Sequence, residues 1–62
     1  MTQSERIILE IMSSHIIGNN KVPSLNMPIL KGLEKFGYVE LLKEIDIWHI
    51  TKAGRDALEP NR

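Results

Sequence analysis

The sequence predicts an α+β fold in which helices pack against a two-stranded antiparallel β-hairpin. Apolar residues follow helical spacing at about residues 3–16 and again over 28–36. Two short stretches, 38–41 and 47–51, alternate instead with a period of two, which is typical of half-buried strands. A last helical pattern begins at Lys52, so the expected order is helix, helix, strand, strand, helix.

Length and composition indicate one small soluble domain, spanning residues 1–62. The chain has 42% hydrophobic and 26% charged residues, as ordinary globular domains do. A chain this short buries only about 60% of the surface that its unfolded state exposes. There are no cysteines, which excludes disulfides and thiolate metal sites as reinforcement. Packing alone, or packing together with a dimer partner, must therefore stabilise the fold.

The first helix is predicted at about residues 3–16. Thr2 and Glu5 fit a capping box, in which each side chain accepts the backbone N–H of the other residue. Gly18 ends the helical pattern and is followed by two asparagines, which tolerate turn conformations. The predicted apolar stripe consists of Ile8, Leu9, Ile11, Met12 and His15 or Ile16.

The segment from Lys21 to Pro28 is the hardest to interpret. Pro23 and Pro28 exclude one continuous helix, because proline lacks an amide donor and disfavours helical geometry in the residue before it. Ser24 can cap a single turn, and Asn26 can cap the next helix, with Pro28 near its first turn. A helix between residues 16 and 28 is therefore expected to be abbreviated or replaced by an extended loop.

Helical spacing is clear from Pro28 onwards. Positions i, i+4 and i+7 are apolar and are expected to be buried. Gly37 then ends the helix where a left-handed residue is favoured. The side expected to be buried consists of Ile29, Leu30, Leu33 and Phe36, and the opposite side consists of Lys31, Gly32, Glu34 and Lys35.

The period of two divides the hairpin side chains between two faces. The face expected to close the core over the helices carries Val39, Leu41, Trp48 and Ile50. Trp48 can also stack on a base or anchor a partner, but its alternation with Ile50 favours the core. The outward face has apolar residues at Leu42, Ile45 and Ile47. An exposed apolar patch on a small domain suggests a protein partner.

The final helix is expected from Lys52 to about Glu59. Thr51 is placed to act as its N-cap, and Pro60 stops it. Ala53, Ala57 and Leu58 are expected to pack against the rest of the chain.

The stretch from Leu33 to Leu58 contains the pattern L-E-K-x-G-Y-V-E followed by W-x-I-T-K-A-G-R-x-A-L. It resembles winged-helix DNA-binding domains of bacterial and archaeal transcription regulators, broadly the MarR-like and PadR-like groups. The resemblance implies a small winged helix, in which the helix ending at Gly37 is the recognition helix and the hairpin is the wing. The abbreviated second helix departs from a full helix-turn-helix. Winged helices also serve as protein-interaction modules, so the resemblance implies the fold more strongly than the function.

In the resembled fold, the recognition helix lies in the major groove of double-stranded DNA. The candidate DNA contacts are Asn26, Lys31, Lys35, Lys21 and Arg55. Eight basic and eight acidic residues give a net charge of zero, so there is no global attraction to phosphates. Residues 36–50 are acidic, with Glu40, Glu44 and Asp46 against Lys43. The helix, rather than the wing, is therefore expected to face DNA.

Two functions from different classes follow. The first is a small DNA-binding transcriptional regulator, which as a homodimer would match a symmetric site. The second is a protein–protein interaction module, such as an adaptor or inhibitor of a regulator. Its contact surface would be Leu42, Ile45 and Ile47.

The sequence gives no indication of an enzyme. His15 and His49 are the only histidines, and neither has a ligand spacing such as H-x-x-x-H. Phosphate-loop and nucleophile motifs are absent from the sequence, so no catalytic residue, metal or cofactor is expected. The chain shows neither a signal-peptide pattern nor an apolar run of about 20 residues, and a cytoplasmic location without a membrane contact is expected.

Overall fold

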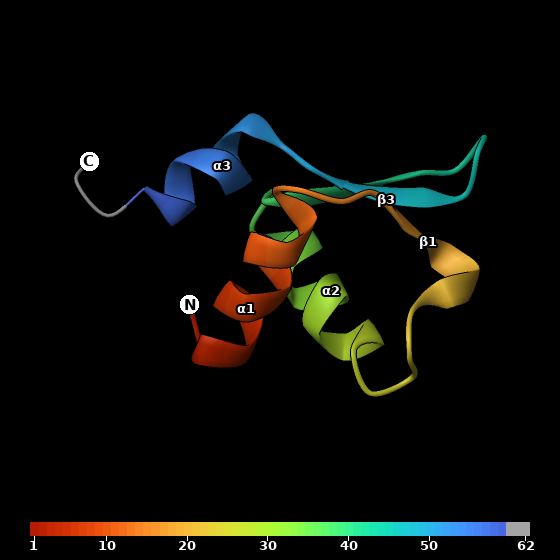
Figure 1. Ribbon diagram of the computed structural model, residues 1–62, viewed down its shortest axis with the longest axis horizontal. Coiled ribbons are helices and arrows are strands. Elements are labelled where there is room, and N and C mark those ends of the chain that lie inside the picture. The colour runs from red at the N-terminus through yellow and green to blue at the C-terminus, as the bar shows by residue number, and fades with distance from the viewer. Residues whose placement is uncertain (60–62) are drawn as a thin grey trace.

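The computed structural model describes residues 1–59, which form helices below a short antiparallel sheet (Figure 1). The α+β prediction is confirmed, and the arrangement is compatible with a small winged helix. None of the helices in this part of the chain is long and apolar enough to cross a membrane. The elements are α1 (Gln3–Met12), β1 (Ile17–Gly18), the 3-10 turn η1 (Asn19–Lys21), α2 (Met27–Lys35), β2 (Val39–Leu42), β3 (Ile47–Ile50) and α3 (Lys52–Leu58).

The sheet has the order β1-β3-β2, with β3 in the centre. In the predicted hairpin, Val39 lies opposite Ile50 and Leu41 lies opposite Trp48, so these four residues share one face, as predicted. The expectation of two strands was incomplete, because Ile17 pairs with Trp48 in an additional strand, β1. A strand of two residues has no periodicity, and its pairing is decided by a partner 31 positions away in the chain.

The start of α1 is as predicted, whereas its end is not. Glu5 N–H donates to Thr2 Oγ1 (3.2 Å), and Thr2 N–H donates to Glu5 Oε1 (2.8 Å), which completes the capping box. The helix ends at Met12 rather than near residue 16, because the chain leaves it to bring Ile17 beside Trp48. The predicted apolar stripe is wrong at two positions, since Ile11 is 46% and Ile16 is 68% exposed.

Gly37 ends α2 in the predicted left-handed conformation, with φ of 80°. Its N–H donates to Glu34 O (2.9 Å), and the N–H of Tyr38 donates to Leu33 O (3.0 Å). These two bonds satisfy carbonyls at the helix end and form a Schellman motif. At the other end, Asn26 occupies the N-cap position, but its side chain makes no capping hydrogen bond.

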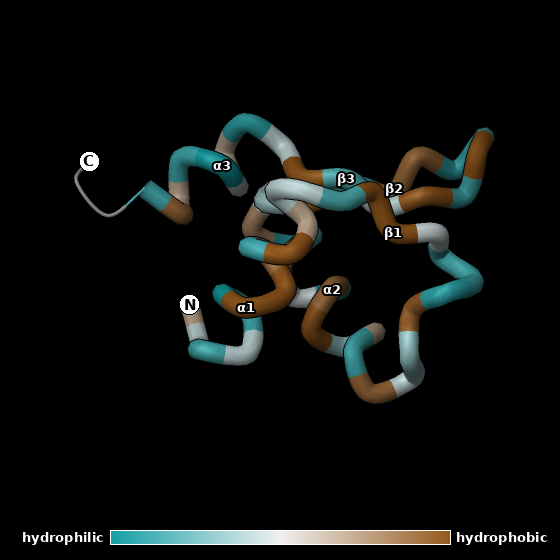
Figure 2. Tube along the Cα trace, viewed as in Figure 1, coloured by the Kyte–Doolittle hydropathy of each residue, from teal (hydrophilic) through white to brown (hydrophobic). Residues whose placement is uncertain are grey.

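The core lies between the helices and the lower face of the sheet, where hydrophobic segments of α1, α2 and the strands converge (Figure 2). Phe36, expected in this core, is 60% exposed and stacks instead on Tyr38, with ring centroids 5.5 Å apart. It is the C-cap of α2, where the chain turns away from the helix. The buried apolar residues are Leu9, Met12, Leu30, Leu33, Val39, Trp48 and Ile50.

The α3 helix rests on the junction between α2 and β2 through Thr51 and Gly54. Thr51 Oγ1 donates to Gly37 O (2.6 Å) and accepts the N–H of Gly54 (3.1 Å), which confirms the predicted N-cap. Gly54 is buried, and a Cβ there would overlap with the carbonyl oxygen of Tyr38 and lie 2.7 Å from Ile50 Cγ1. The glycine of the T-x-A-G sequence is therefore explained by close packing, because no larger residue fits against Tyr38 and Ile50. Pro60, expected to stop this helix, lies outside the described residues.

Candidate nucleic-acid interface

The outer side of α2 is the candidate DNA-contacting surface. The helix packs against α1 and β2 through its buried side, which includes Leu30 and Leu33. Pro28, Lys31 and Lys35 are exposed, and their i, i+3, i+7 spacing places them in one line along the helix. The exposed stripe therefore carries two cations. Gly32 does not belong to it, contrary to expectation, because a Cβ there would lie 3.3 Å from Glu5 Oε2 on α1.

Lys31 has an intramolecular partner that the sequence pattern does not reveal. Its Nζ lies 5.7 Å from the centroid of the Trp48 ring, within the range of a cation–π contact. Such a contact at an exposed lysine contributes about 0.5–1 kcal/mol. The ammonium group of Lys31 therefore lies over the indole ring although the residue is exposed. Among the described residues, Lys35 makes no such contact with an aromatic ring.

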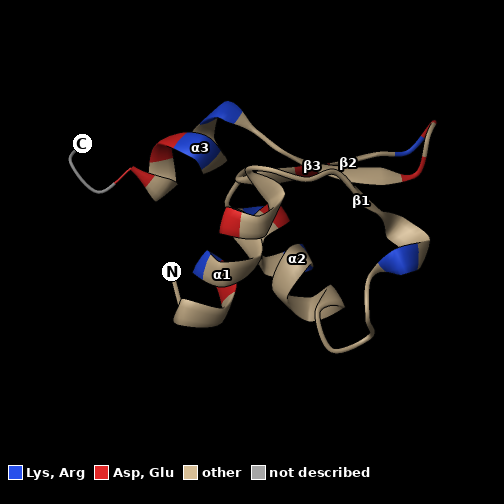
Figure 3. Ribbon diagram, in the orientation of Figure 1, with Lys and Arg blue, Asp and Glu red and all other residues tan. Residues whose placement is uncertain are grey.

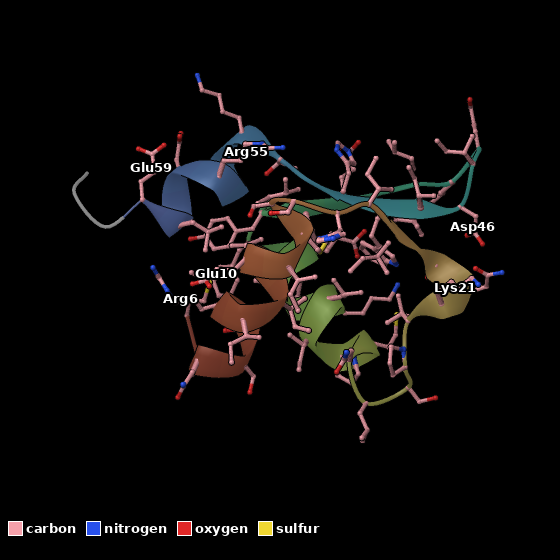
Figure 4. All side chains as sticks on the ribbon, viewed as in Figure 1. Arg6, Glu10, Lys21, Asp46, Arg55 and Glu59 are labelled. Atoms are coloured by element: carbon pink, nitrogen blue, oxygen red, sulfur yellow. The ribbon has the colours of Figure 1, made fainter. Side chains whose placement is uncertain are left out.

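Lys21 is exposed and lies at the end of η1, the turn that contacts the same tryptophan. Asn19, two residues earlier, accepts the indole N–H of Trp48 through Oδ1 (2.8 Å). Asn19 Nδ2 also donates to Asp46 Oδ1 (3.1 Å), so an acidic group lies at this corner of the molecule. Figure 4 shows Lys21 and Asp46 at the same end of the fold.

Asn26 and Arg55, the other two candidates, are placed less favourably for DNA. Asn26 is half-buried at the start of α2, and its carbonyl accepts the N–H of Leu30 (3.0 Å). Arg55 lies on α3, well to the left of Lys21 in Figure 4, and its Nη1 donates to Ser13 O (3.5 Å). Arg55 therefore links α3 to the end of α1, and the structure does not bring it to the α2 stripe.

Charges of both signs are interspersed over the described residues, as Figure 3 shows for α1, α3 and the hairpin. On α1, Arg6 Nε lies 3.2 Å from Glu10 Oε1 in an i,i+4 ion pair. Glu34 accompanies the lysines on the exposed side of α2. The positive electrostatic potential that would attract DNA, a polyanion, is therefore local and modest.

The two histidines and Arg55 line one hollow of about 240 Å³ between α1, β3 and α3. His49 Nε2 lies 3.3 Å from Glu40 Oε1 across the hairpin, and His15 Nδ1 lies 3.3 Å from Ile11 O. Within residues 1–59, no three histidine, cysteine or acidic side chains are grouped so that they could hold a metal ion.

The surface expected to contact a protein is only partly exposed. Leu42 and Ile47 lie opposite each other on the hairpin and are half-buried, contrary to expectation, because each covers the other. Ile45, in the turn, is 63% exposed. An open groove of about 360 Å³ lies here. Its lining residues are Leu41, Leu42, Lys43, Glu44 and Ile45.

Several exposed apolar side chains were not singled out from the sequence as surface residues. Ile7 on α1 is 50% exposed, and Leu25, ahead of α2, is 88% exposed. Phe36, which the helical spacing assigned to the core, is the only aromatic side chain among them. Spacing alone cannot find these residues, because it does not show which side of a helix a neighbouring element covers.

No protein-family model matches this chain, and neither a curated protein nor a solved structure matches it. The fold and the residues described above are therefore the basis for a functional proposal.

Proposed function

We propose that this protein binds double-stranded DNA through the outer side of α2, as a small winged-helix transcriptional regulator. The supporting observation is the exposed line of Pro28, Lys31 and Lys35 on a helix whose other side is buried. Lysine ammonium groups on one side of a helix can meet the phosphates that border a groove. Lys21, exposed at the end of η1, is a third cation in this proposal.

The expected affinity is modest and strongly dependent on salt. Three lysine–phosphate contacts give a slope of about −2.7 in a plot of log K against log salt concentration. A fourfold increase in salt therefore weakens binding about 40-fold. A homodimer with six such contacts has about twice this slope, which explains why dimerisation would matter for a chain with zero net charge.

Titration of a labelled DNA duplex at several salt concentrations tests this proposal. The double variant Lys31→Ala and Lys35→Ala should bind less tightly and lower the slope by about 2 per chain. The matched control is Lys43→Ala in the hairpin turn, an exposed lysine away from α2. Circular dichroism checks that losing the Lys31–Trp48 contact leaves the fold intact. Absence of binding at low salt, or binding that salt does not weaken, contradicts the proposal.

A second function, protein binding at the end of the hairpin, is favoured by a separate observation. Ile45 is exposed beside an apolar-lined groove, and the neighbouring Glu44 and Asp46 make this end unsuited to DNA. The substitution Ile45→Lys should abolish such binding while leaving the α2 surface unchanged. If cross-linking finds the same partners for the variant as for the original chain, this surface is not the contact.

A further inference from the structure

The hollow of about 240 Å³ lies where the end of α1, β3 and α3 meet, and no residue of α2 lines it among those described. Its polar lining supplies two hydroxyls, two imidazoles and a guanidinium, from Ser13, Ser14, His15, His49 and Arg55. None of the described residues that line it is acidic. Groups of this kind donate hydrogen bonds, and three of them carry or can acquire a positive charge, so the lining matches an anion.

Main-chain oxygens at the end of α1 would oppose an anion, because a helix C-terminus carries a partial negative charge. Three of these oxygens already accept hydrogen bonds from residues of the hollow. Ser13 Oγ donates to Glu10 O (2.6 Å), and Arg55 Nη1 donates to Ser13 O (3.5 Å). His15 Nδ1 lies 3.3 Å from Ile11 O and is the donor, since a carbonyl only accepts. These acceptors therefore have partners, while donors remain.

Arg55 retains most of its hydrogen-bonding capacity. A guanidinium has five N–H donors in a planar fork, and the contact with Ser13 O uses one of them. Arg6 pairs with Glu10 at 3.2 Å, whereas Arg55 forms no ion pair within residues 1–59. The hollow therefore contains a permanent positive charge that no carboxylate of the described chain neutralises.

Each histidine has one ring nitrogen left for a further partner. His49 Nε2 lies 3.3 Å from Glu40 Oε1 and donates to it, which leaves Nδ1, and His15 donates through Nδ1, which leaves Nε2. A ring that takes up a proton becomes positive, and its second nitrogen becomes a donor. The charged groups around the two rings are of both signs, Glu40 on β2 and Arg55 on α3. The hollow therefore gains donors as the pH falls.

The arrangement of these donors favours a tetrahedral anion over a planar one. The donors come from three segments, the end of α1, β3 and α3, and so approach a ligand from different sides. A phosphate group presents oxygens in several directions, and an arginine fork binds two of them at once. The volume of about 240 Å³ is below the range of about 300–1,000 Å³ for drug-sized ligands, so the ligand is small.

We propose that the hollow lined by His15, His49 and Arg55 binds the phosphate group of a small molecule, either inorganic phosphate or a phosphomonoester. Arg55 supplies the permanent charge and a two-pronged contact, and the histidines add charge at lower pH. The hydroxyl of Ser14 is a donor for a further oxygen. This site goes beyond the proposed function and does not rest on DNA binding by α2.

NMR titration of the whole chain with inorganic phosphate, at an ionic strength held constant with chloride, tests the proposal. Phosphate should shift the signals of His15, His49 and Arg55 and reach saturation, and acetate, a planar anion, should bind more weakly. Arg55→Gln should weaken phosphate binding about ten- to a hundredfold, because hydrogen bonds to a charged group are lost. The matched control is Arg6→Gln, which removes the same charge outside the hollow.

Substitution of Ile16 tests the site without removing a donor. Ile16 lines the hollow and is 68% exposed, so a polar side chain there does not disturb the core. Ile16→Glu should weaken phosphate binding by repulsion, whereas Ile16→Gln, which has the same shape without the charge, should retain most of it. The fluorescence of Trp48 checks that each variant is folded. Equal phosphate binding by the two folded variants contradicts the site.

Sulfate separates the titration of the protein from that of the ligand, because sulfate keeps its charge between about pH 8 and about pH 5, where histidine becomes charged. Sulfate binding should tighten as the pH falls through this range. The double variant His15→Gln and His49→Gln should lose most of this dependence. A sulfate affinity that does not change with pH overturns the role assigned to the imidazoles.

Phosphate that shifts no signal at the hollow overturns the proposal, and so does a loss of binding in Arg6→Gln as large as that in Arg55→Gln. Displacement of phosphate by duplex DNA overturns it as well, since the hollow would then be a DNA contact. Methyl phosphate distinguishes the two ligands: binding as tight as that of inorganic phosphate supports a phosphomonoester, and weaker binding supports the free ion. DNA binding by α2 is measured separately, and its failure does not affect this site.

Discussion

The α3 junction and the α1–α2 connection are held together by different kinds of contact. In the junction, formed by Gly37, Tyr38, Thr51 and Gly54, short hydrogen bonds and a missing Cβ bring α3 against the start of β2. The connection, residues 13–26, contains a two-residue strand and one 3-10 turn.

Long-range contacts hold the connection in place. Asn19 accepts from Trp48 and donates to Asp46, 29 and 27 residues away in the chain. The junction therefore depends on residue types with strong conformational preferences, which a sequence pattern displays. The connection depends on the pairing of β1 with β3 and on the Asn19 side chain, whose partners lie far away in the sequence and are known only from the folded structure.

The largest effect should come from Gly54→Ala at the junction. The added Cβ would overlap with the main chain of Tyr38, which cannot move away as a flexible side chain can. We expect a loss of about 2–3 kcal/mol in the free energy of unfolding, of a total of roughly 3–9 kcal/mol for a chain of this length. Denaturant unfolding followed by the fluorescence of Trp48 measures it.

The matched control is Gly32→Ala, also within a helix, where the added Cβ would meet only the end of the Glu5 side chain. Alanine has less conformational entropy than glycine to lose on folding. This variant should therefore be as stable as the original, or more stable by up to about 1 kcal/mol. Equal losses at the two glycines would show that the close contact at Gly54 does not govern the junction.

The next largest effect should come from Asn19→Ala in the connection. Removing Oδ1 leaves the indole N–H of the fully buried Trp48 without its acceptor, at a cost of about 1–3 kcal/mol. The fluorescence of Trp48 should also change in the folded state. Asn20→Ala, at an exposed position in the same turn, should change stability by no more than about 0.5 kcal/mol. If both variants behave alike, Asn19 is not the anchor of the connection.

The smallest of the three effects should come from Gly37→Ala. No atom lies within 4 Å of a Cβ at this position, so the cost is that of a left-handed backbone alone, about 1 kcal/mol. Gly37→Asn should cost less, since asparagine tolerates this conformation better. Thermal unfolding of the two variants gives the comparison, and a loss as large as that of Gly54→Ala would point to crowding rather than strain.

The candidate surfaces were harder to predict than the fold. Helical spacing correctly placed Leu30 and Leu33 inside but also assigned Phe36 to the core. Spacing cannot show that the chain turns at the C-cap and carries this ring outward. Spacing also failed to show the contact of Lys31. Its polar neighbours suggested a purely solvent-facing position, but its ammonium group lies over Trp48.

The sequence by itself determined the N-caps of α1 and α3, the left-handed glycine, the two faces of the hairpin and hence the α+β class. These features depend on interactions between residues close in the chain or on a strict alternation of side chains. Only the tertiary structure decided where α1 ends, that β1 joins the sheet, and that the outer edge of β2 remains unpaired. Each of these depends on which distant segment covers a surface, and a local pattern does not contain that information.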